Sequence, residues 1–381
     1  MNELTQVVVI GGGYAGVMAA NRLTRRDDVA VTLVNPRPHF VERIRLHQLA
    51  AGSGDAAVAY RDVLAARVRL VVDRVTGIDA ASRRVTLADG GALGYDYLIY
   101  AVGSAGASVP EFAYPVTTFE EARRLRPVLD AASAVTVVGA GPAGIETAAE
   151  LAEAGRAVTL VCGGQLGPYL HPSGRHAVAG RLAKLGVTVL ADAVVSEVTR
   201  DAVRLADGRE LPSPITIWTA GFGVPDLATR SGLSTDALGR LRTDETLTSV
   251  DDDRIVAAGD AAAPSDLPYR MGCQSAVQLG PQAAETVLSR LAGARPAPAE
   301  VGFAGQCLSL GRRAGIFQFS RRDDTAIRLH LGGRLGAKVK ELVCASTVKQ
   351  LAYEARKPGA RKWWVTDKRR RELLREHLVD A

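Results

Sequence analysis

The sequence predicts an α/β protein with more than one domain, and three observations support this prediction. The chain has 381 residues, more than one typical domain of roughly 100 to 200 residues. Hydrophobic residues make up 47% of it and charged residues 23%, which is typical of a globular protein with a full core. A segment with the pattern of strand, glycine-rich loop, helix and strand occurs twice, and this alternation favours parallel sheets covered by helices.

The two copies of this segment are similar residue by residue. Residues 7–16 read VVVIGGGYAG and residues 135–144 read VTVVGAGPAG, so each has a β-branched run followed by G-x-G-x-x-G. Each copy later contains the same five residues, AVTLV, at positions 30–34 and 157–161. The repeat therefore predicts two Rossmann-like units.

The three glycines of such a loop have separate physical roles in binding a dinucleotide. The first permits a tight turn, the second lets the backbone approach the pyrophosphate, and the third lets the helix pack on the strand. The N-terminus of the helix then faces the phosphates. One loop alone is a weak indication, but two in the same context predict two bound nucleotides. The candidate binding residues are Gly11, Gly13, Tyr14, Ala15 and Gly16 in the first loop, and Gly139, Gly141 and Gly144 in the second.

Neither copy has the acidic residue that normally binds the adenosine ribose, about 20 residues past the loop. Asn35 stands there in the first copy, and its amide can still hydrogen-bond a ribose. Cys162 stands there in the second copy. A thiol is a poor partner for a ribose, and without a carboxylate nothing repels a 2′-phosphate. NADPH is therefore as compatible with this loop as NADH, with His171 and Arg175 as more distant candidates for phosphate contact.

Other segments supply further candidate binding residues. Residues 254–260, RIVAAGD, form an apolar strand that ends in Gly259 and Asp260. After two nucleotide loops, such an aspartate predicts a hydrogen bond to the ribitol chain of a flavin. Residues 97–104, YLIYAVGS, form another apolar strand that ends in small residues, and the candidates there are Ala101 and Gly103.

With these segments in this order, the chain resembles the two-dinucleotide-binding flavoproteins, which include disulfide reductases, ferredoxin reductases and type II NADH dehydrogenases. The resemblance covers roughly residues 5–295. It implies an FAD-binding domain over residues 1–112 and 241–295, into which an NADH- or NADPH-binding domain is inserted at residues 113–240. It also implies a small C-terminal α+β segment with a basic tail, residues 296–381.

Within this family, two features are similar to type II NADH dehydrogenases and the apoptosis-inducing-factor-like ferroptosis suppressor, both of which reduce quinones. Glu146 follows the second loop in the pattern G-x-G-x-x-G-x-E, and Gln274 and Gln278 lie in CQSAVQ, which resembles a quinone-site signature. The glutamines are four residues apart and therefore share one helix face. The alternatives are a first-turn carboxylate that favours the helix dipole and two solvated glutamines.

The same region raises one geometric expectation and excludes one subclass. Gly280 and Pro281 follow the glutamines closely and are expected to interrupt or kink their helix. Residues 39–50, HFVERIRLHQLA, contain none of the cysteines that disulfide reductases need beside the flavin. Residues 307–319 and 333–347 look like the C-terminal segment of the ferroptosis-suppressor type.

The resemblance implies a reaction in which NAD(P)H passes hydride to FAD, and the flavin reduces a quinone or a similar small acceptor near Gln274 and Gln278. Glu146 would assist proton transfer, and His47 is a second proton donor in a segment where Arg43 borders the flavin. Two alternatives stay open: a flavin-dependent oxidase or tailoring enzyme that acts directly on an organic substrate, and a non-catalytic redox-sensing flavoprotein.

The net charge of +6 lies mostly in the tail, where residues 356–381 hold nine bases and four acids. Trp363 and Trp364 lie among these bases, and tryptophan prefers the membrane–water interface. The tail therefore predicts either a peripheral membrane contact or a solvated helix whose tryptophans pack on the chain itself or on a homodimer partner. Nucleic-acid binding has no support beyond charge.

Other features argue against several classes. The N-terminus runs directly into Val7–Ile10 without a basic leader segment, which predicts a cytoplasmic protein, with a place at the inner face of the membrane if the tail binds there. No apolar run approaches the roughly 18 residues of a spanning helix. The four cysteines and six histidines are scattered, so no metal site is predicted.

Overall fold

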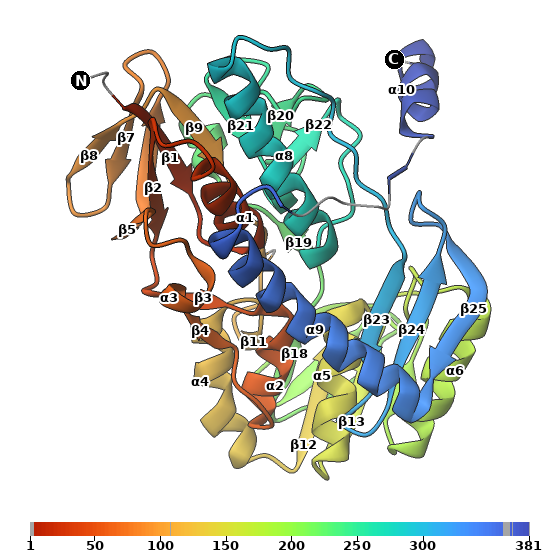
Figure 1. Cartoon of the computed structure of the whole chain (residues 1–381). Coiled ribbons are helices and arrows are strands. Elements are labelled where there is room, and N and C mark those ends of the chain that lie inside the picture. Colours follow the sequence, from red (N-terminus) through yellow and green to blue (C-terminus); the bar gives the residue numbers. More distant parts are fainter. Residues whose placement is uncertain (1–3, 107, 361–365, 368, 381) are drawn as a thin grey trace.

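The computed structural model describes residues 4–106, 108–360, 366–367 and 369–380, and its centre is two five-stranded parallel sheets. The first sheet has the strand order β21-β9-β1-β2-β5 (Figure 1). Val7 to Ile10 of β1 are almost fully buried, which explains their unbroken apolar run. The strands are β1 (Thr5–Ile10), β2 (Val29–Asn35), β5 (Arg69–Val72), β9 (Tyr97–Tyr100) and β21 (Ile255–Ala257).

The second sheet repeats this arrangement in the order β11-β18-β12-β13-β14. Its two central strands pair in parallel from Ala134 opposite Ala157 to Val138 opposite Val161, as Thr5 to Ile10 pair with Val29 to Val34 in the first sheet. The strands are β11 (Ala113–Pro115), β12 (Ala134–Val138), β13 (Ala157–Val161), β14 (Thr188–Leu190) and β18 (Thr216–Trp218).

The two sheets differ in where their outer strand comes from. In the second sheet, β11 precedes the Gly-loop strand, whereas in the first sheet β21 returns from beyond the whole second sheet. The chain thus leaves the first sheet after β9 and rejoins it at Ile255. This topology confirms the predicted fold class, in which one Rossmann-like unit is inserted in the other.

Each domain also contains a small antiparallel sheet of three strands, and helices cover the two parallel sheets. The small sheets are β6 (Val75–Asp79), β7 (Arg84–Leu87) and β8 (Ala92–Gly94), and β15 (Val195–Val198), β16 (Ala202–Leu205) and β17 (Glu210–Pro212). The helices are α1 (Tyr14–Leu23), α2 (Leu46–Ala51), α3 (Tyr60–Val63), α4 (Phe119–Asp130), α5 (Pro142–Glu153), α6 (Pro172–Lys184), α7 (Leu227–Arg230) and α8 (Cys273–Leu291). Two-stranded pairings join β3 (His39–Val41) to β4 (Ala57–Ala59), β10 (Ala105–Gly106) to β19 (Phe222–Gly223), and β20 (Leu241–Thr243) to β22 (Ala262–Pro264).

Helix α8 packs closely against α1, and one of its glycines explains how. A Cβ at Gly280 would overlap the carbonyl oxygen of Ala15, so only glycine permits this approach of the two helices. The expected interruption of α8 at Gly280–Pro281 is wrong, because the helix continues to Leu291. The physical reason is that packing against α1 compensates for the hydrogen bond that Pro281 cannot make.

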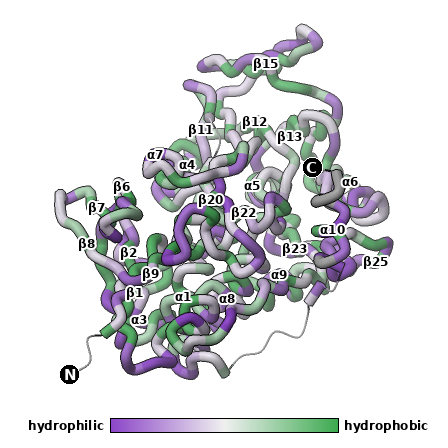
Figure 2. The backbone as a smooth tube through the Cα atoms, turned by 90° about the horizontal axis from the view of Figure 1, so that it is seen from above, coloured by the Kyte–Doolittle hydropathy of each residue, from purple (hydrophilic) through white to green (hydrophobic). Residues whose placement is uncertain are grey.

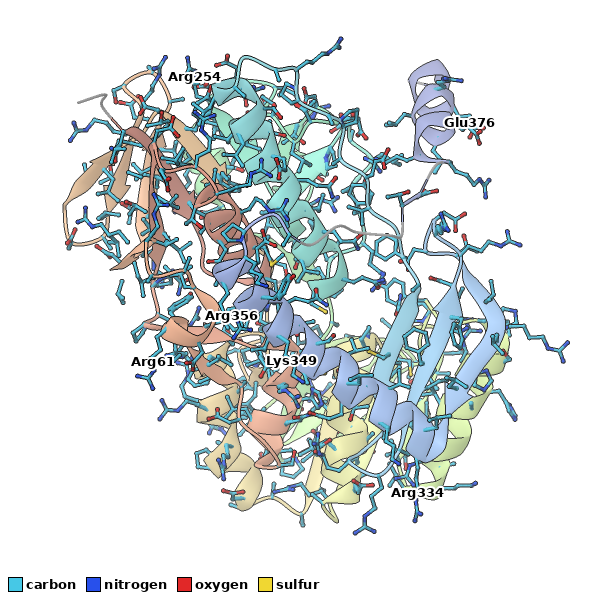
Figure 3. All side chains as sticks on the ribbon, viewed as in Figure 1. Arg61, Arg254, Arg334, Lys349, Arg356 and Glu376 are labelled. Carbon is cyan, nitrogen blue, oxygen red and sulfur yellow. The ribbon has the colours of Figure 1, made fainter. Side chains whose placement is uncertain are left out.

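The C-terminal segment forms a three-stranded antiparallel sheet and a long helix. These elements are β23 (Gly305–Ser309), β24 (Gly315–Ser320), β25 (Ala326–Gly332) and α9 (Gly333–Arg356). Helix α9 runs diagonally across the molecule, from this sheet to α1 (Figure 1). Its far end is fixed by fully buried Glu354, which accepts a hydrogen bond from Arg22 of α1. Arg334, Lys349 and Arg356 are exposed along it (Figure 3).

The basic tail ends in α10 (Arg370–Asp380), which is largely hydrophilic, in contrast to the apolar strand β1 (Figure 2). Arg370 pairs with Glu245 at 2.7 Å and lies over the ring of Tyr269. This contact fixes the start of α10 on the first domain. Trp363 and Trp364 lie outside the described residues, so their predicted role is untested. Among the described residues, no helix is both long and apolar enough to cross a membrane.

Candidate functional site

The first Gly-loop has the geometry that its three predicted glycines require. Gly11 has φ +102°, and a Cβ there would overlap the carbonyl oxygen of Ala101 at the end of β9. A Cβ at Gly16 would overlap the carbonyl oxygen of Gly11, so both positions demand glycine. Gly13 is different, because nothing lies within 4 Å of the place where its Cβ would stand. The loop therefore leaves open space at the N-terminus of α1, as a pyrophosphate site needs.

Two side chains hold the same loop from the other side. The Gly12 N–H donates to Oδ1 of Asn35 at 2.9 Å, and the Tyr60 hydroxyl donates to the Gly12 carbonyl at 2.8 Å. The Asn35 amide also donates to the carbonyl of Arg37 at 2.9 Å. Asn35 thus binds the loop through its oxygen and the following turn through its nitrogen. Its predicted contact with a ribose stays a prediction.

The second Gly-loop repeats the backbone geometry with looser surroundings. Gly139 has φ +108°, and its Cβ would lie 2.7 Å from the hydroxyl of Thr219. A Cβ at Gly144 would overlap the Gly139 carbonyl. Gly141 again has nothing within 4 Å of its Cβ position, at the N-terminus of α5. This loop therefore leaves open space at the N-terminus of α5, as the first does at α1.

At the predicted adenosine end of the second loop, the residue in the ribose position is neutral. Burial raises the pKa of the Cys162 thiol to about 11, so the thiol is neutral at physiological pH. Arg175 donates to the carbonyls of Leu166 and Leu170 at 2.9 and 3.1 Å. His171 caps its own helix through Ser173. Both candidates for 2′-phosphate contact thus already bond their own segment.

A hydrogen-bonded chain joins the predicted flavin residues across the first domain. Arg43 donates to the hydroxyl of Ser104 at 2.8 Å, and that hydroxyl donates to Asp260 at 2.6 Å. The other carboxylate oxygen of Asp260 accepts the N–H of Gly272 at 2.8 Å. The network therefore fixes Asp260 beside the start of α8. The turns that bring its parts together contain Gly103 at φ +72° and Gly259 at φ +74°.

Glu146 is the centre of a buried cluster that four segments assemble. It is only 5% exposed, on α5 just behind the second loop. Its Oε1 lies 2.8 Å from Nζ of Lys340 on α9 and accepts the N–H of Ser309 on β23 at 2.9 Å. Its Oε2 lies 3.6 Å from Nδ1 of His47 on α2. The structure thus brings the predicted pair Glu146 and His47 together and adds Lys340.

The electrostatics of this cluster favour an ion pair with a neutral histidine beside it. Burial raises the pKa of Glu146, but Lys340, His47 and the Ser309 N–H together outweigh it, so this pKa is lowered. Burial lowers the pKa of Lys340, but Glu146 together with Cys307 and Cys344 outweighs it, so this pKa is raised. Burial lowers the pKa of His47 to about 4. Its Nε2 is buried without a hydrogen-bond partner.

The predicted glutamines have a different environment from the one we expected. The amide of Gln278 donates to the carbonyl of Gly302 at 3.1 Å, and Gln282 one turn later donates to that of Glu300 at 3.1 Å. Gln274, in the amide orientation that satisfies both its polar atoms, donates to the carbonyl of Gly305 at 3.0 Å. The three amides therefore form a ladder that holds residues 300–305 against α8. The glutamine side chains are therefore neither solvated nor free to line an acceptor pocket.

Three cysteines from different elements surround Lys340. Cys273 begins α8, Cys307 lies on β23 with its carbonyl 3.5 Å from Nζ of Lys340, and Cys344 lies one turn along α9. Burial raises the pKa of each thiol, and Lys340 offsets this only in part. The thiols are therefore neutral and poor nucleophiles. No group of described residues could hold a metal ion.

Several of these residues carry no recognisable signal in the sequence. Lys340 is one of many basic residues in the C-terminal segment, and Ser104 and Ser309 are ordinary strand-end serines. The one available hint for Lys340 is its spacing of four residues from Cys344, which places both on one helix face. Only the packing of α9 across the two domains shows that this face is buried.

Comparisons with known proteins agree with this geometry. The sequence profile of the pyridine nucleotide-disulphide oxidoreductases matches residues 5–286. An NADH dehydrogenase-like protein of Mycobacterium tuberculosis is 33% identical over 328 residues, which cover 76% of this chain and 81% of that protein. A type II NADH:quinone oxidoreductase of the same species is 30% identical, with coverage of 83% and 78%.

Among solved structures, NDH2 of Plasmodium falciparum in complex with NADH has a TM-score of 0.78. It covers 95% of this chain and 99% of its own, at 15% identity, so it supports the fold alone. The profile match spans both Gly-loops and the strand that returns to the first sheet. Together with the mycobacterial relative, it shows that the chain belongs to the pyridine nucleotide-disulphide oxidoreductase family.

Proposed function

We propose that this protein is an FAD-dependent NAD(P)H dehydrogenase that reduces a quinone. The observation that carries the proposal is the buried Glu146–Lys340 ion pair, which lies directly behind the second Gly-loop and beside neutral His47. A buried charge pair held by four separate segments is costly to form and is common where chemistry requires it. The names of the mycobacterial relatives supply the donor and the acceptor.

The residues of the first domain fit FAD. Gly13 leaves a backbone cradle open at the N-terminus of α1, and Gly11 and Gly16 hold that cradle in shape. Asp260 is held in a fixed position by Ser104 and Gly272 and keeps lone pairs that can accept hydrogen bonds from ribitol hydroxyls. When bound, FAD supplies the chemistry of accepting a hydride and passing on two electrons.

The second loop is proposed to bind NADH or NADPH. Gly141 leaves a cradle like that of Gly13, at the N-terminus of a second helix. Because Cys162 stands where a carboxylate would repel a 2′-phosphate, the loop is compatible with both NADH and NADPH. Arg175 and His171 bond their own segment, so neither is held in place for a 2′-phosphate.

At the acceptor, Lys340 and Glu146 have complementary roles. A quinone that gains electrons develops negative charge on its oxygens, and a buried ammonium stabilises such charge. Glu146 keeps the Lys340 ammonium protonated, and His47 stays neutral, so it can accept a proton. Gln274 and Gln278 are proposed to act indirectly, because their amides hold residues 300–305 in place.

The substitution Glu146→Gln tests this function. The variant should bind FAD as the wild type does and reduce quinone more slowly by about 100-fold, at the lower end of a general acid–base contribution. Glu197→Gln, at an exposed carboxylate on β15, is the matched control. Unchanged steady-state rates with a quinone would remove Glu146 from the mechanism.

Stopped-flow flavin reduction separates the proposal from its two alternatives. Fast anaerobic bleaching of the flavin by NADH or NADPH, followed by reoxidation with quinone and not with oxygen, supports the dehydrogenase. An oxidase or tailoring enzyme would reoxidise rapidly with oxygen or ignore nicotinamides. A redox-sensing flavoprotein would turn over slowly with every acceptor.

A peripheral membrane contact is proposed for the outer face of α9, which complements the predicted role of the tail. This face exposes Leu335, Leu342 and Tyr353, and Leu342 is 66% exposed. The basic residues Lys349 and Arg356 lie among them (Figure 3). Such a mixture favours the surface of an anionic bilayer. Leu342→Glu should weaken cosedimentation with anionic vesicles, and equal binding to neutral vesicles would contradict the assignment.

A further inference from the structure

Quinone reduction creates a demand for protons that the cluster around Glu146 cannot meet alone. Reduction of a quinone to a quinol takes up two electrons and two protons and forms two O–H bonds. The hydride of NAD(P)H brings both electrons and one proton, so each turnover draws one more proton from the solvent. Glu146, His47 and Lys340 are at most 7% exposed, which separates them from that supply.

Glu150 lies one helical turn beyond Glu146 on α5 and is a buried carboxylate with a free atom. It is 3% exposed, and its Oε2 has no hydrogen-bond partner. Its Oε1 accepts a hydrogen bond from the hydroxyl of Ser53. Residues four apart on a helix are neighbours, with about 5–6 Å between their Cβ atoms. Glu150 therefore lies beside Glu146 without being part of its ion pair.

The charges around Glu150 favour a carboxyl that can hold a proton. Burial raises its pKa above the usual value, and the nearby carboxylates of Glu153 and Glu146 raise it further. The Ser53 hydroxyl and Arg312, in the β23–β24 turn, act in the opposite direction but do not cancel this. A carboxyl of this kind exchanges protons at a higher pH than one in solution.

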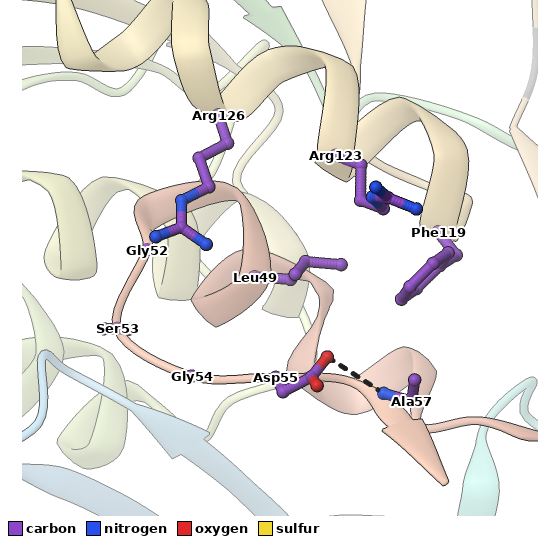
Figure 4. Close-up of a pocket in the computed structure, with 9 residues that line it drawn as sticks. All are labelled: Leu49, Gly52, Ser53, Gly54, Asp55, Ala57, Phe119, Arg123 and Arg126. Atoms are coloured by element: carbon purple, nitrogen blue, oxygen red, sulfur yellow. Dashed lines mark hydrogen bonds between the residues drawn. The ribbon is translucent and has the colours of Figure 1, made fainter. Parts of the chain in front are cut away.

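Ser53 connects Glu150 with the solvent. It lies in the loop that follows α2 and lines an open groove of about 560 Å³ between that loop and α4 (Figure 4). Arg123 and Arg126 of α4 form the opposite side of the groove. Ser53 is exposed there, so water in the groove reaches the residue whose hydroxyl bonds Glu150.

The contact between α2 and α5 contains both ends of the path. His47 lies on α2 and Ser53 directly after it, while Glu146 and Glu150 lie on consecutive turns of α5. His47 faces Glu146 at 3.6 Å, and Ser53 bonds Glu150. At the inner end, Nε2 of His47 is a second buried atom without a partner. Glu150 Oε2 and His47 Nε2 thus lie on facing helices, and each has a free position for a proton. They lie between the Ser53–Glu150 hydrogen bond and the His47–Glu146 pair.

We propose that Glu150 relays solvent protons from the groove at Ser53 to His47 and Glu146 during acceptor reduction. The inference rests on the proposed function, since only a proton-consuming acceptor needs such a path. Water in the groove protonates Glu150 through Ser53, and Glu150 passes the proton inward to the cluster. Glu150 is a relay residue that touches neither the acceptor nor the cofactor.

The test compares two acceptors in the FAD-loaded, full-length protein. Glu150→Gln keeps an oxygen that can accept the Ser53 hydroxyl but cannot carry a proton. Above pH 7, the variant should slow reoxidation of the reduced flavin by a water-soluble benzoquinone by about tenfold. This is less than the loss of a general acid–base group causes, because a relay residue does not touch the acceptor. Reduction of hexacyanoferrate, which takes up no proton, should be unchanged. Ser53→Ala should slow the quinone reaction less, and Ser53→Thr should restore it.

Glu210→Gln is the matched control, because it removes an exposed carboxylate on β17 that pairs with Arg204 at 2.9 Å. It should leave the quinone rate and its pH profile unchanged. Equal loss with both acceptors would mean that Glu150 is structural, and a wild-type quinone rate in Glu150→Gln across the pH range would also overturn the relay. Failure of the wild-type protein to reduce any quinone would instead refute the proposed function.

A readout independent of turnover is the infrared carboxyl band. The difference spectrum between wild type and Glu150→Gln should contain a protonated carboxyl that titrates above the usual glutamate range and exchanges in D2O. Ser53→Ala should slow this exchange. Absence of such a band above the usual glutamate range, or exchange at the same rate in Ser53→Ala, would contradict the path.

Discussion

The two Gly-loops share one backbone and differ in what surrounds it. Gly11 and Gly139 have φ values of +102° and +108°, and each donates its N–H to the second strand at 2.8 Å. The first loop is additionally held by Asn35 and by Tyr60. The second loop is held by Thr219, whose hydroxyl donates to the Gly139 carbonyl at 3.1 Å. At the position equivalent to Asn35 it has Cys162, a neutral thiol that makes no hydrogen bond to the described residues of the loop.

This difference indicates how one duplicated unit can serve two kinds of ligand. A loop fixed from several sides is preorganised, so a ligand loses less conformational freedom on binding and dissociates slowly. A loop that is held by Thr219 and has a thiol in place of the Asn35 amide suits a ligand that must leave in every turnover. The first loop therefore fits a resident flavin, and the second fits an exchangeable nicotinamide.

The largest expected effect is the loss of FAD when the first loop is filled. Gly13 has open space at its Cβ position, so Gly13→Val should fold and yet fill the pyrophosphate site. We expect FAD affinity to fall by about 100-fold or more, equivalent to the loss of about two charge-assisted hydrogen bonds. The measurement is the flavin absorbance per mole of purified protein, with circular dichroism to verify folding. A folded variant that keeps its full flavin content would contradict the assignment.

The corresponding change in the second loop should leave the protein yellow. Gly141→Val fills an equally open position, so the dissociation constant for nicotinamide should rise by about 30-fold while FAD stays bound. Anaerobic titration of flavin reduction at increasing NADH and NADPH concentrations measures this. Loss of FAD in this variant would reverse the roles of the loops.

A smaller effect is expected from making the second loop resemble an NADH site. Cys162→Glu adds a carboxylate that can accept ribose hydroxyls and repel a 2′-phosphate, so preference for NADH over NADPH should rise by about tenfold. The ratio of kcat/KM for the two nicotinamides measures it, with Cys162→Gln as the uncharged control. A ratio that does not change, or the same change in both variants, would show that this position does not face the ribose.

The smallest effect concerns the extra support of the first loop. Asn35→Ala removes the acceptor for the Gly12 N–H, and the free energy of unfolding should fall by about 1–2 kcal/mol. Cys162→Ala, at the equivalent position, should change it less because no hydrogen bond to the loop is lost. Urea denaturation of both variants measures the difference, and equal losses would remove the contrast between the loops.

Much of the fold was predictable because its constraints are local. A positive φ at Gly11 and the overlap that any Cβ would cause at Gly16 are properties of a few consecutive residues, so the G-x-G-x-x-G pattern predicts them. Repetition of the pattern predicts the duplicated sheet for the same reason. The continuous helix through Pro281 was not predictable, because its contacts with α1 come from a distant part of the chain.

The sequence by itself determined the fold class, the two loops and the choice of Glu146 and His47 as candidates. Only the tertiary structure decided that these two residues meet, that Lys340 pairs with Glu146, and that the glutamines of α8 bond the backbone of residues 300–305. The reason is physical: glycine geometry is set by neighbouring residues, whereas a buried charge finds its partner only when separate elements pack. Helix α9 brings that partner from the C-terminal segment.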